Sequence, residues 1–136
     1  MMQLTLQELP KLCEIIVQNL PHGGIVILQG DLASGKTTFT QSFAAFLGLE
    51  DAVTSPTFSL QQNYNDRLYH YDLYNYGFDK FVSLGMMEEL EREGYHLIEW
   101  GDEKLVDVLK RAGMECMVIK ITKCNNNMRC YEVHNG

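Results

Sequence analysis

Apolar residues along the chain recur at two spacings, one typical of helices and one typical of strands. Segments with helical spacing are Thr5 to Leu20, Lys36 to Leu47, Phe78 to Gly94 in two pieces broken near Gly85, and Asp102 to Leu109. The first segment opens on Thr5 with Glu8 three residues later, which is typical of a helix capping box. Pro10 then falls within the first two turns of that helix rather than at the position proline prefers.

Strands are predicted between these helices. Two continuous apolar runs, Ile25 to Leu28 and Tyr95 to Trp100, predict buried strands. Alternating stretches predict four more, at Phe58 to Tyr64, Leu68 to Tyr74, Met114 to Thr122 and Met128 to Val133. Turns at Asn65-Asp66 and Asn125 to Asn127 join these into hairpins. The pattern predicts one α/β domain over residues 1–136, with a mainly parallel sheet, an antiparallel hairpin and flanking helices.

The segment between the first strand and the second helix carries a phosphate-loop pattern. Residues 30–38 read Gly-Asp-Leu-Ala-Ser-Gly-Lys-Thr-Thr, which fits G-x-x-x-x-G-K-[ST]. Glycines let backbone N–H groups point at phosphates, and the start of a helix adds the positive end of its dipole. The residues expected to bind nucleotide here are Asp31, Leu32, Ala33, Ser34, Gly35, Lys36, Thr37 and Thr38. Lys36 would neutralise the β- and γ-phosphates, and the Thr37 hydroxyl would be a magnesium ligand.

Four later residues are candidates for the same site. Thr57 follows Ser55-Pro56, where the sequence fits either a polar turn before a strand or a switch segment that contacts magnesium and the γ-phosphate. Asp72, near the end of a strand, is either a second magnesium ligand or a solvent-facing carboxylate. Glu99 and Trp100 end the buried strand, where open α/β sheets place their active sites. Glu99 could orient water or assist the metal. Trp100 could pack in the core, or its flat ring could stack on a nucleotide base or a partner.

Composition narrows the class of function. The chain has 18 acidic and 11 basic residues and a formal net charge of −7, so broad electrostatic binding to nucleic acid is not expected. No apolar run approaches the roughly 20 residues of a membrane span, and a cytoplasmic protein is the expectation. The four cysteines lack zinc spacing, and a phosphate loop implies a reducing compartment, so they are predicted to be free thiols.

Together these motifs resemble one family. The phosphate loop, Ser-Pro-Thr-Phe at 55–58, His-Tyr-Asp-Leu-Tyr at 70–74, Leu84-Gly85 with Glu89-Leu90, and Ile98-Glu99-Trp100 stand in the order and spacing of the TsaE (YjeE) family. The resemblance spans nearly the whole chain. It implies an Mg-ATP-dependent ATPase required for threonylcarbamoyladenosine at position 37 of transfer RNA, working with TsaB, TsaD and TsaC. TsaE binds the TsaB–TsaD pair and resets or regulates it, so tRNA would be reached only through partners.

The resemblance also assigns roles to residues. It places Lys36 and Thr37 on phosphate and magnesium, Thr57 in the switch-like loop, Asp72 in the magnesium site, and Glu99 with Trp100 in the active region. Two positions depart from the family pattern. Ala33 replaces a usual glycine, and Asn75 replaces the arginine that commonly follows the tyrosine of the 70–74 motif.

Two other functions use the same loop. A small-molecule kinase would transfer phosphate to an acceptor, but the four arginines are dispersed and form no arginine-rich lid. A nucleotide-dependent binding module would switch partner affinity by occupancy without essential hydrolysis. No guanine-reading N-K-x-D motif is present, so ATP is the expected nucleotide by resemblance.

Overall fold

The structure is a computed structural model that describes residues 2–30, 36–49, 60–74, 77–124 and 128–135. The helices are η1 (Leu6–Glu8), α1 (Leu9–Asn19), α2 (Lys36–Phe46), α3 (Gly77–Ser83), α4 (Met86–Glu89) and α5 (Glu103–Arg111). The strands are β1 (Met2–Leu4), β2 (Gly23–Gln29), β3 (Gln61–Tyr64), β4 (Leu68–Asp72), β5 (Gly94–Glu99), β6 (Cys116–Lys123) and β7 (Arg129–Asn135).

The strands form one sheet in the order β1-β7-β6-β2-β5-β4-β3. Its four central strands, β6, β2, β5 and β4, pair in parallel, while β3, β7 and β1 add antiparallel pairings at the two edges. The predicted mainly parallel sheet with an antiparallel hairpin is therefore confirmed. The β3–β4 hairpin lies at one edge, and β7 and β1 form an antiparallel extension at the other edge.

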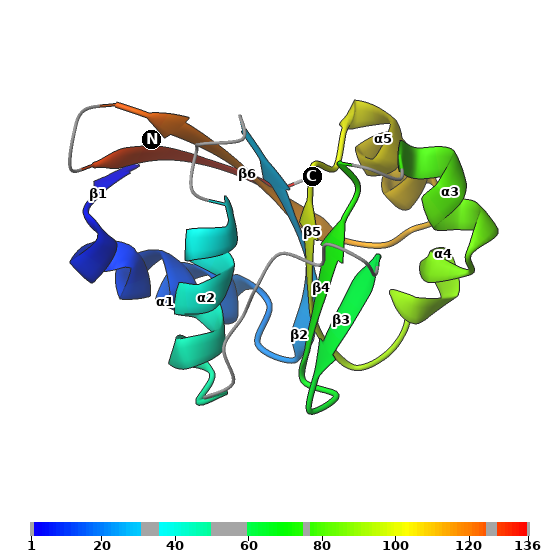
Figure 1. The fold of residues 1–136 in the computed structure, drawn as a ribbon, viewed down its shortest axis with the longest axis horizontal. Helices are drawn as coiled ribbons and strands as arrows, with labels where there is room; N and C mark the ends of the chain where they lie inside the picture. Colours follow the sequence, from blue (N-terminus) through cyan, green and yellow to red (C-terminus); the bar gives the residue numbers. More distant parts are fainter. Residues whose placement is uncertain (1, 31–35, 50–59, 75–76, 125–127, 136) are drawn as a thin grey trace.

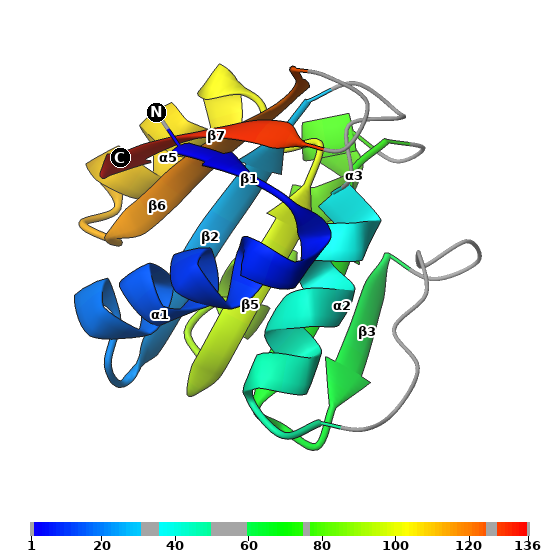
Figure 2. The ribbon, with the colours of Figure 1, turned by 90° about the vertical axis from the view of Figure 1, so that its left-hand side faces the viewer.

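Helices cover both faces of this sheet (Figures 1 and 2). Helices α1 and α2 pack on one face, and α3, α4 and α5 pack on the other. Side chains of β2 alternate between the two layers, since Val26 and Leu28 join the first core cluster while Ile25 and Ile27 join the second. Burial on both sides explains why β2 and β5 appear in the sequence as continuous apolar runs.

The first helix begins later than the sequence pattern predicts. Residues Leu6–Glu8 form a 3-10 turn, and the α-helix starts at Leu9, so Pro10 falls in its first turn, where no N–H partner is needed. The predicted capping box is present, because the Glu8 carboxylate accepts hydrogen bonds from the backbone N–H and the hydroxyl of Thr5. Strand β1 was not predicted, because three residues are too few to show an alternating pattern of apolar and polar positions.

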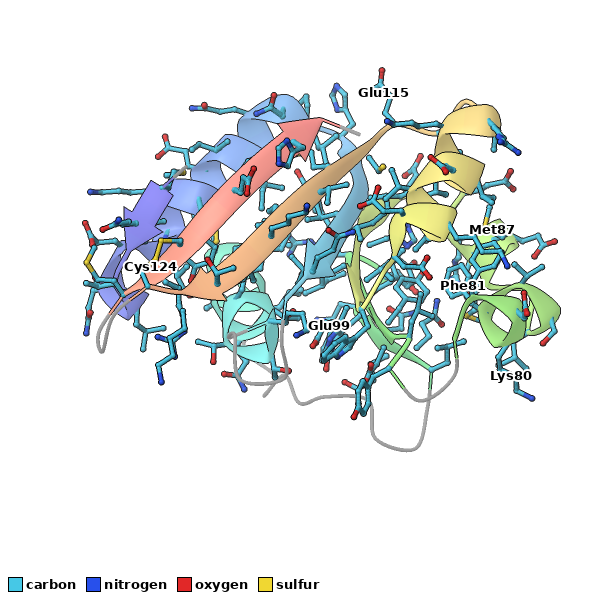
Figure 3. All side chains as sticks on the ribbon, turned by 90° about the horizontal axis from the view of Figure 1, so that it is seen from above. Lys80, Phe81, Met87, Glu99, Glu115 and Cys124 are labelled. Carbon is cyan, nitrogen blue, oxygen red and sulfur yellow. A yellow bond between two sulfur atoms is a disulfide. The ribbon has the colours of Figure 1, made fainter. Side chains whose placement is uncertain are left out.

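The prediction of four free thiols is wrong for two of them. Cys13 and Cys116 are buried free cysteines, but Cys124 and Cys130 form a disulfide. Antiparallel pairing of β6 with β7 sets Thr122 opposite Cys130 and brings Cys124 near it, with the two cysteine Cα atoms 5.8 Å apart. Figure 3 shows Cys124 far from Glu99. Spacing along the chain could not reveal this pairing because the hairpin register creates it.

A buried hydrogen-bond chain links β3, β4 and β5. The Gln61 amide donates to the Tyr71 hydroxyl at 3.2 Å, and the Tyr71 hydroxyl lies 2.7 Å from Nδ1 of His96. His96 Nε2 lies 2.8 Å from the carbonyl oxygen of Arg92, which can only accept. Nε2 therefore carries the hydrogen and Nδ1 accepts from Tyr71. This arrangement requires neutral His96, and burial lowers its pKa below the ordinary 6.5.

Folding stability is accordingly expected to fall as the pH drops below about 6.5, because the unfolded chain then binds a proton that folded His96 resists. This single group can remove at most about 1.4 kcal/mol per pH unit. Urea unfolding at pH 7.5, 6.5 and 5.5 measures the slope, with exposed His22→Asn as the matched control. His96→Phe, which keeps a ring to stack on Tyr69, should flatten the slope; an unchanged slope would contradict this assignment.

Within the described part of the chain, no helix has the length and apolar character needed to cross a membrane.

Candidate functional site

The ends of three parallel strands meet at one point of the sheet. The register pairs Leu28 of β2 with Glu99 of β5, and Glu99 with Asp72 of β4. The two predicted acidic residues therefore stand side by side at the carboxyl ends of neighbouring strands. Figure 3 shows Glu99 between α2 and the helices on the other face of the sheet.

Lys36 enters this region from the start of α2. Its side chain is buried, with 3% of the residue exposed, and its Nζ donates to the Gly30 carbonyl oxygen at 2.8 Å. The same Nζ lies 3.9 Å from the centroid of the Trp100 ring, within the range of a cation–π interaction. The ammonium group is thus held at the junction between β2 and α2, where the phosphate-loop pattern places it.

Glu99 is contacted from two elements. The Thr37 hydroxyl of α2 lies 3.3 Å from Oε1 and 3.4 Å from Oε2 of Glu99. On the sheet side, Nε2 of His70 makes a close contact with Oε2 of Glu99. Glu99 is 4% exposed and His70 is fully buried, so this carboxylate is fixed in a largely desolvated position.

Asp72 is buried, which excludes the solvent-facing alternative considered for it. Its Oδ1 accepts a hydrogen bond from the backbone N–H of Tyr74 at 2.9 Å. Burial raises the pKa of Asp72, and the negative charge of Glu99 raises it further, while the Tyr74 hydrogen bond and the charges of His70 and Lys36 act in the opposite direction. Two neighbouring acidic groups in a buried site are costly without a cation.

Trp100 adopts an unusual backbone conformation directly after Glu99. Its φ is +66°, a left-handed value that is rare for an aromatic residue. Its backbone N–H donates to the Leu28 carbonyl at 3.1 Å, and its ring contacts the Tyr74 ring at 4.8 Å between centroids. Gly101 follows because a Cβ there would lie 2.5 Å from the Ile27 side chain. The turn therefore directs the indole over Lys36, and strain of this kind concentrates at functional sites.

The oxygen donors of this cluster fit a magnesium ion. Mg²⁺ prefers hydroxyl, carboxylate and water oxygens and takes few protein ligands. Thr37, Asp72 and Glu99 supply such oxygens. Among the described residues, no group of three or more His, Cys, Asp or Glu side chains could by itself hold a metal ion.

The structure places Lys36, Thr37, Asp72, Glu99 and Trp100 near one another, at the start of α2 and the ends of β4 and β5. Thr38 is exposed in the first turn of α2. The remaining candidates, Asp31, Leu32, Ala33, Ser34, Gly35 and Thr57, lie outside the described residues, as does Asn75.

Sequence reasoning gave no site role to His70 or Tyr74. A signal for both was present, because the predicted alternation of residues 68–74 already places His70 and Tyr74 on the same face as Asp72.

Replacement of Asp72 by asparagine is expected to stabilise the fold at neutral pH. The folded pKa of Asp72 lies above its unfolded value of 3.8, so ionisation above that range costs folding free energy that the neutral amide avoids. Asparagine keeps an oxygen to accept from Tyr74. The Tm of Asp72→Asn is expected to exceed that of the wild type at pH 7, and the difference should disappear as the pH approaches 3.8. Calorimetry measures it, with exposed Asp107→Asn as the control; a loss of stability in Asp72→Asn alone would refute the argument.

Strand, phosphate-loop sequence and helix, followed by acidic residues at the ends of the adjacent parallel strands, define an α/β protein of the phosphate-binding-loop type. A crystal structure of YdiB from Bacillus subtilis shares the fold, with a TM-score of 0.68, 28% identity, and coverage of 99% of this chain and 87% of that one. The chain belongs to the TsaE family, because the family model described as threonylcarbamoyl adenosine biosynthesis protein TsaE matches residues 4–131.

Characterised relatives support the same membership. The tRNA threonylcarbamoyladenosine biosynthesis protein TsaE of Bacillus subtilis is 40% identical over 124 residues, which is 82% of this chain and 78% of the relative. The protein of the same name from Rickettsia prowazekii is 31% identical over 134 residues, covering 94% of this chain and 89% of the relative.

Proposed function

We propose that this chain is a magnesium-dependent ATPase that acts in the formation of threonylcarbamoyladenosine on tRNA. One observation carries the proposal: a buried carboxylate, Glu99, contacts the hydroxyl of the phosphate-loop threonine, Thr37, at 3.3 Å, and the loop lysine lies beside them. Membership of the TsaE family supplies the pathway.

In this proposal, Lys36 binds the β- and γ-phosphate oxygens. Its ammonium group would exchange the Gly30 carbonyl for phosphate and would counter the charge that develops on transfer. The positive end of the α2 dipole would face the same anion. The loop residues Asp31 to Gly35 and Thr38 are expected to complete the phosphate cradle, and Thr57 to contact the γ-phosphate.

Thr37, Asp72 and Glu99 would hold magnesium, which when bound neutralises phosphate charge and orients the nucleotide. Glu99 would also orient the attacking water and accept its proton. Its place at the carboxyl end of β5, beside the Thr37 hydroxyl, favours this role. Trp100 would present its ring to the nucleotide from a position already fixed by the Glu99–Trp100–Gly101 turn.

Partners are part of the proposal. Family resemblance names the TsaB–TsaD pair, with this chain as a regulatory or resetting subunit in the cytoplasm. The net charge of −7 favours an indirect relation to tRNA, because a polyanion gains little from this surface.

Phosphate release from ATP tests the function. We expect slow release by the chain alone that depends on magnesium and changes when purified TsaB–TsaD is added. Lys36→Ala provides the blank. An equal rate of phosphate release with and without TsaB–TsaD, together with no complex on a sizing column, would contradict the regulatory role. That result would favour a small-molecule kinase. Nucleotide-dependent complex formation without any release would instead favour a binding module.

A further inference from the structure

His70 is a fully buried side chain that contacts Glu99 from the sheet. It lies on β4 two residues before Asp72 and on the same face, and β4 pairs in parallel with β5. Its Nε2 contacts Oε2 of Glu99. An ionised carboxylate only accepts hydrogen bonds, so Nε2 carries the hydrogen and donates it.

Two side chains contact the Glu99 carboxylate, a threonine from α2 and a histidine from the sheet. Thr37 reaches it from α2 through a hydroxyl at 3.3 and 3.4 Å. That hydroxyl is also the group expected to turn toward magnesium, in which case it no longer orients Glu99. His70 belongs to the rigid sheet and has no competing hydrogen-bond partner among the described residues, since its Nδ1 atom is buried and unpaired there.

A second buried histidine shows what a structural role looks like in this fold. His96 uses both ring nitrogens, one toward Tyr71 and one toward the Arg92 carbonyl. Within the described part of the chain, His70 instead leaves Nδ1 unpaired and has Nε2 in contact with Glu99. An unpaired buried nitrogen disfavours folding, which points to a role in the site rather than in the core.

We infer that His70 is a positioning residue that holds the Glu99 carboxylate at the end of β5 in the orientation needed for hydrolysis. The inference rests on the proposed ATPase function and deepens it. Partners in the second layer of a site typically change activity by about 10–100-fold when removed, because they fix a group that does the chemistry.

The test compares two variants that replace His70 by an amide side chain, His70→Asn and His70→Gln. The amide nitrogen of glutamine reaches about as far as imidazole Nε2, whereas that of asparagine is one methylene shorter and cannot reach Glu99. His70→Asn is expected to lower kcat for ATP hydrolysis by about 10–100-fold, with the Kd for Mg-ATP changed by less than about threefold. His70→Gln should restore most of the turnover. Fluorescence of Trp100, the single tryptophan of the chain, reports binding.

A double variant separates positioning from a structural effect. In a Glu99→Gln background, His70→Asn should lower turnover little further, because the group it positions has already lost its function. Equal turnover for His70→Asn and wild type would overturn the inference. So would a loss of Mg-ATP binding in both amide variants, because that result assigns His70 to the fold.

A spectroscopic measurement keeps the test independent of hydrolysis. If the wild-type protein releases no phosphate under any condition, the proposed function fails, but ¹⁵N NMR of the imidazoles still reports on the contact. We expect a slowly exchanging Nε2–H on His70 that is lost in Glu99→Ala, while the Nε2–H of His96 is unchanged. A His70 protonated on Nδ1 alone, or a signal indifferent to Glu99→Ala, would overturn the contact itself.

Discussion

Replacement of Lys36 by alanine is expected to weaken Mg-ATP binding by at least about 100-fold, or about 2.7 kcal/mol. Lys36 is the buried cation at the start of α2, with its Nζ 2.8 Å from the Gly30 carbonyl and 3.9 Å from the Trp100 ring centroid. A phosphate group in this position would lose its principal opposite charge, and no other lysine or arginine of the described residues is buried. Isothermal titration calorimetry measures the change.

The matched control is Lys80→Ala. Lys80 is an exposed lysine on α3 that Figure 3 shows pointing away from Glu99, and its loss should leave Mg-ATP binding unchanged. Lys36→Ala should also unfold at nearly the wild-type temperature, because removing a buried ammonium group relieves its desolvation. Equal affinities for wild type and Lys36→Ala would exclude Lys36 from the phosphate site.

Local patterns in the sequence were sufficient for the parallel core of the fold. Continuous apolar runs at β2 and β5 reflect burial on both faces, and the helical spacing of Phe39 and Phe43 marks α2. The site was predictable for a related reason. Parallel strands end at the same edge of a sheet, so Asp72 and Glu99 could be placed together once both were assigned to strand ends.

Features that depend on pairing between distant segments were not predictable. The Cys124–Cys130 disulfide arises from the register of β6 and β7, and the short strand β1 exists because β7 offers it a free edge. The close contact between His70 and Glu99 depends on the register of β4 against β5, which no local pattern indicates. The left-handed conformation of Trp100 is set by its hydrogen bond to Leu28 across strands, and no local pattern indicates it.

Groups that are unfavourable for folding gather at the strand ends that form the candidate site. Asp72 has its pKa raised by burial and by Glu99, and His70 leaves a nitrogen unpaired among the described residues. Each is unfavourable for folding, and each lies within one cluster of side chains. The proposed binding of magnesium and a nucleotide phosphate at these strand ends would offset the cost of the two neighbouring carboxylates.

Glu99→Gln is expected to keep Mg-ATP binding and to lose turnover, with kcat reduced by about 10²–10⁴-fold. Glutamine preserves the size of the side chain and an oxygen that can accept from Thr37 and His70, so the local structure should persist. The amide cannot accept a proton from water, and it lacks the charge that orients the attacking water. Phosphate release measures kcat, and Trp100 fluorescence measures binding in the same samples.

The control for this variant is Glu103→Gln, an exposed carboxylate in the first turn of α5, whose turnover should match wild type. Comparison with Lys36→Ala then separates occupancy from hydrolysis in partner binding. If TsaB–TsaD still binds Glu99→Gln with ATP but does not bind Lys36→Ala, the complex depends on the bound nucleotide and hydrolysis serves to release it. Full turnover in Glu99→Gln would remove Glu99 from the mechanism and transfer the role of water activation to another residue of the site.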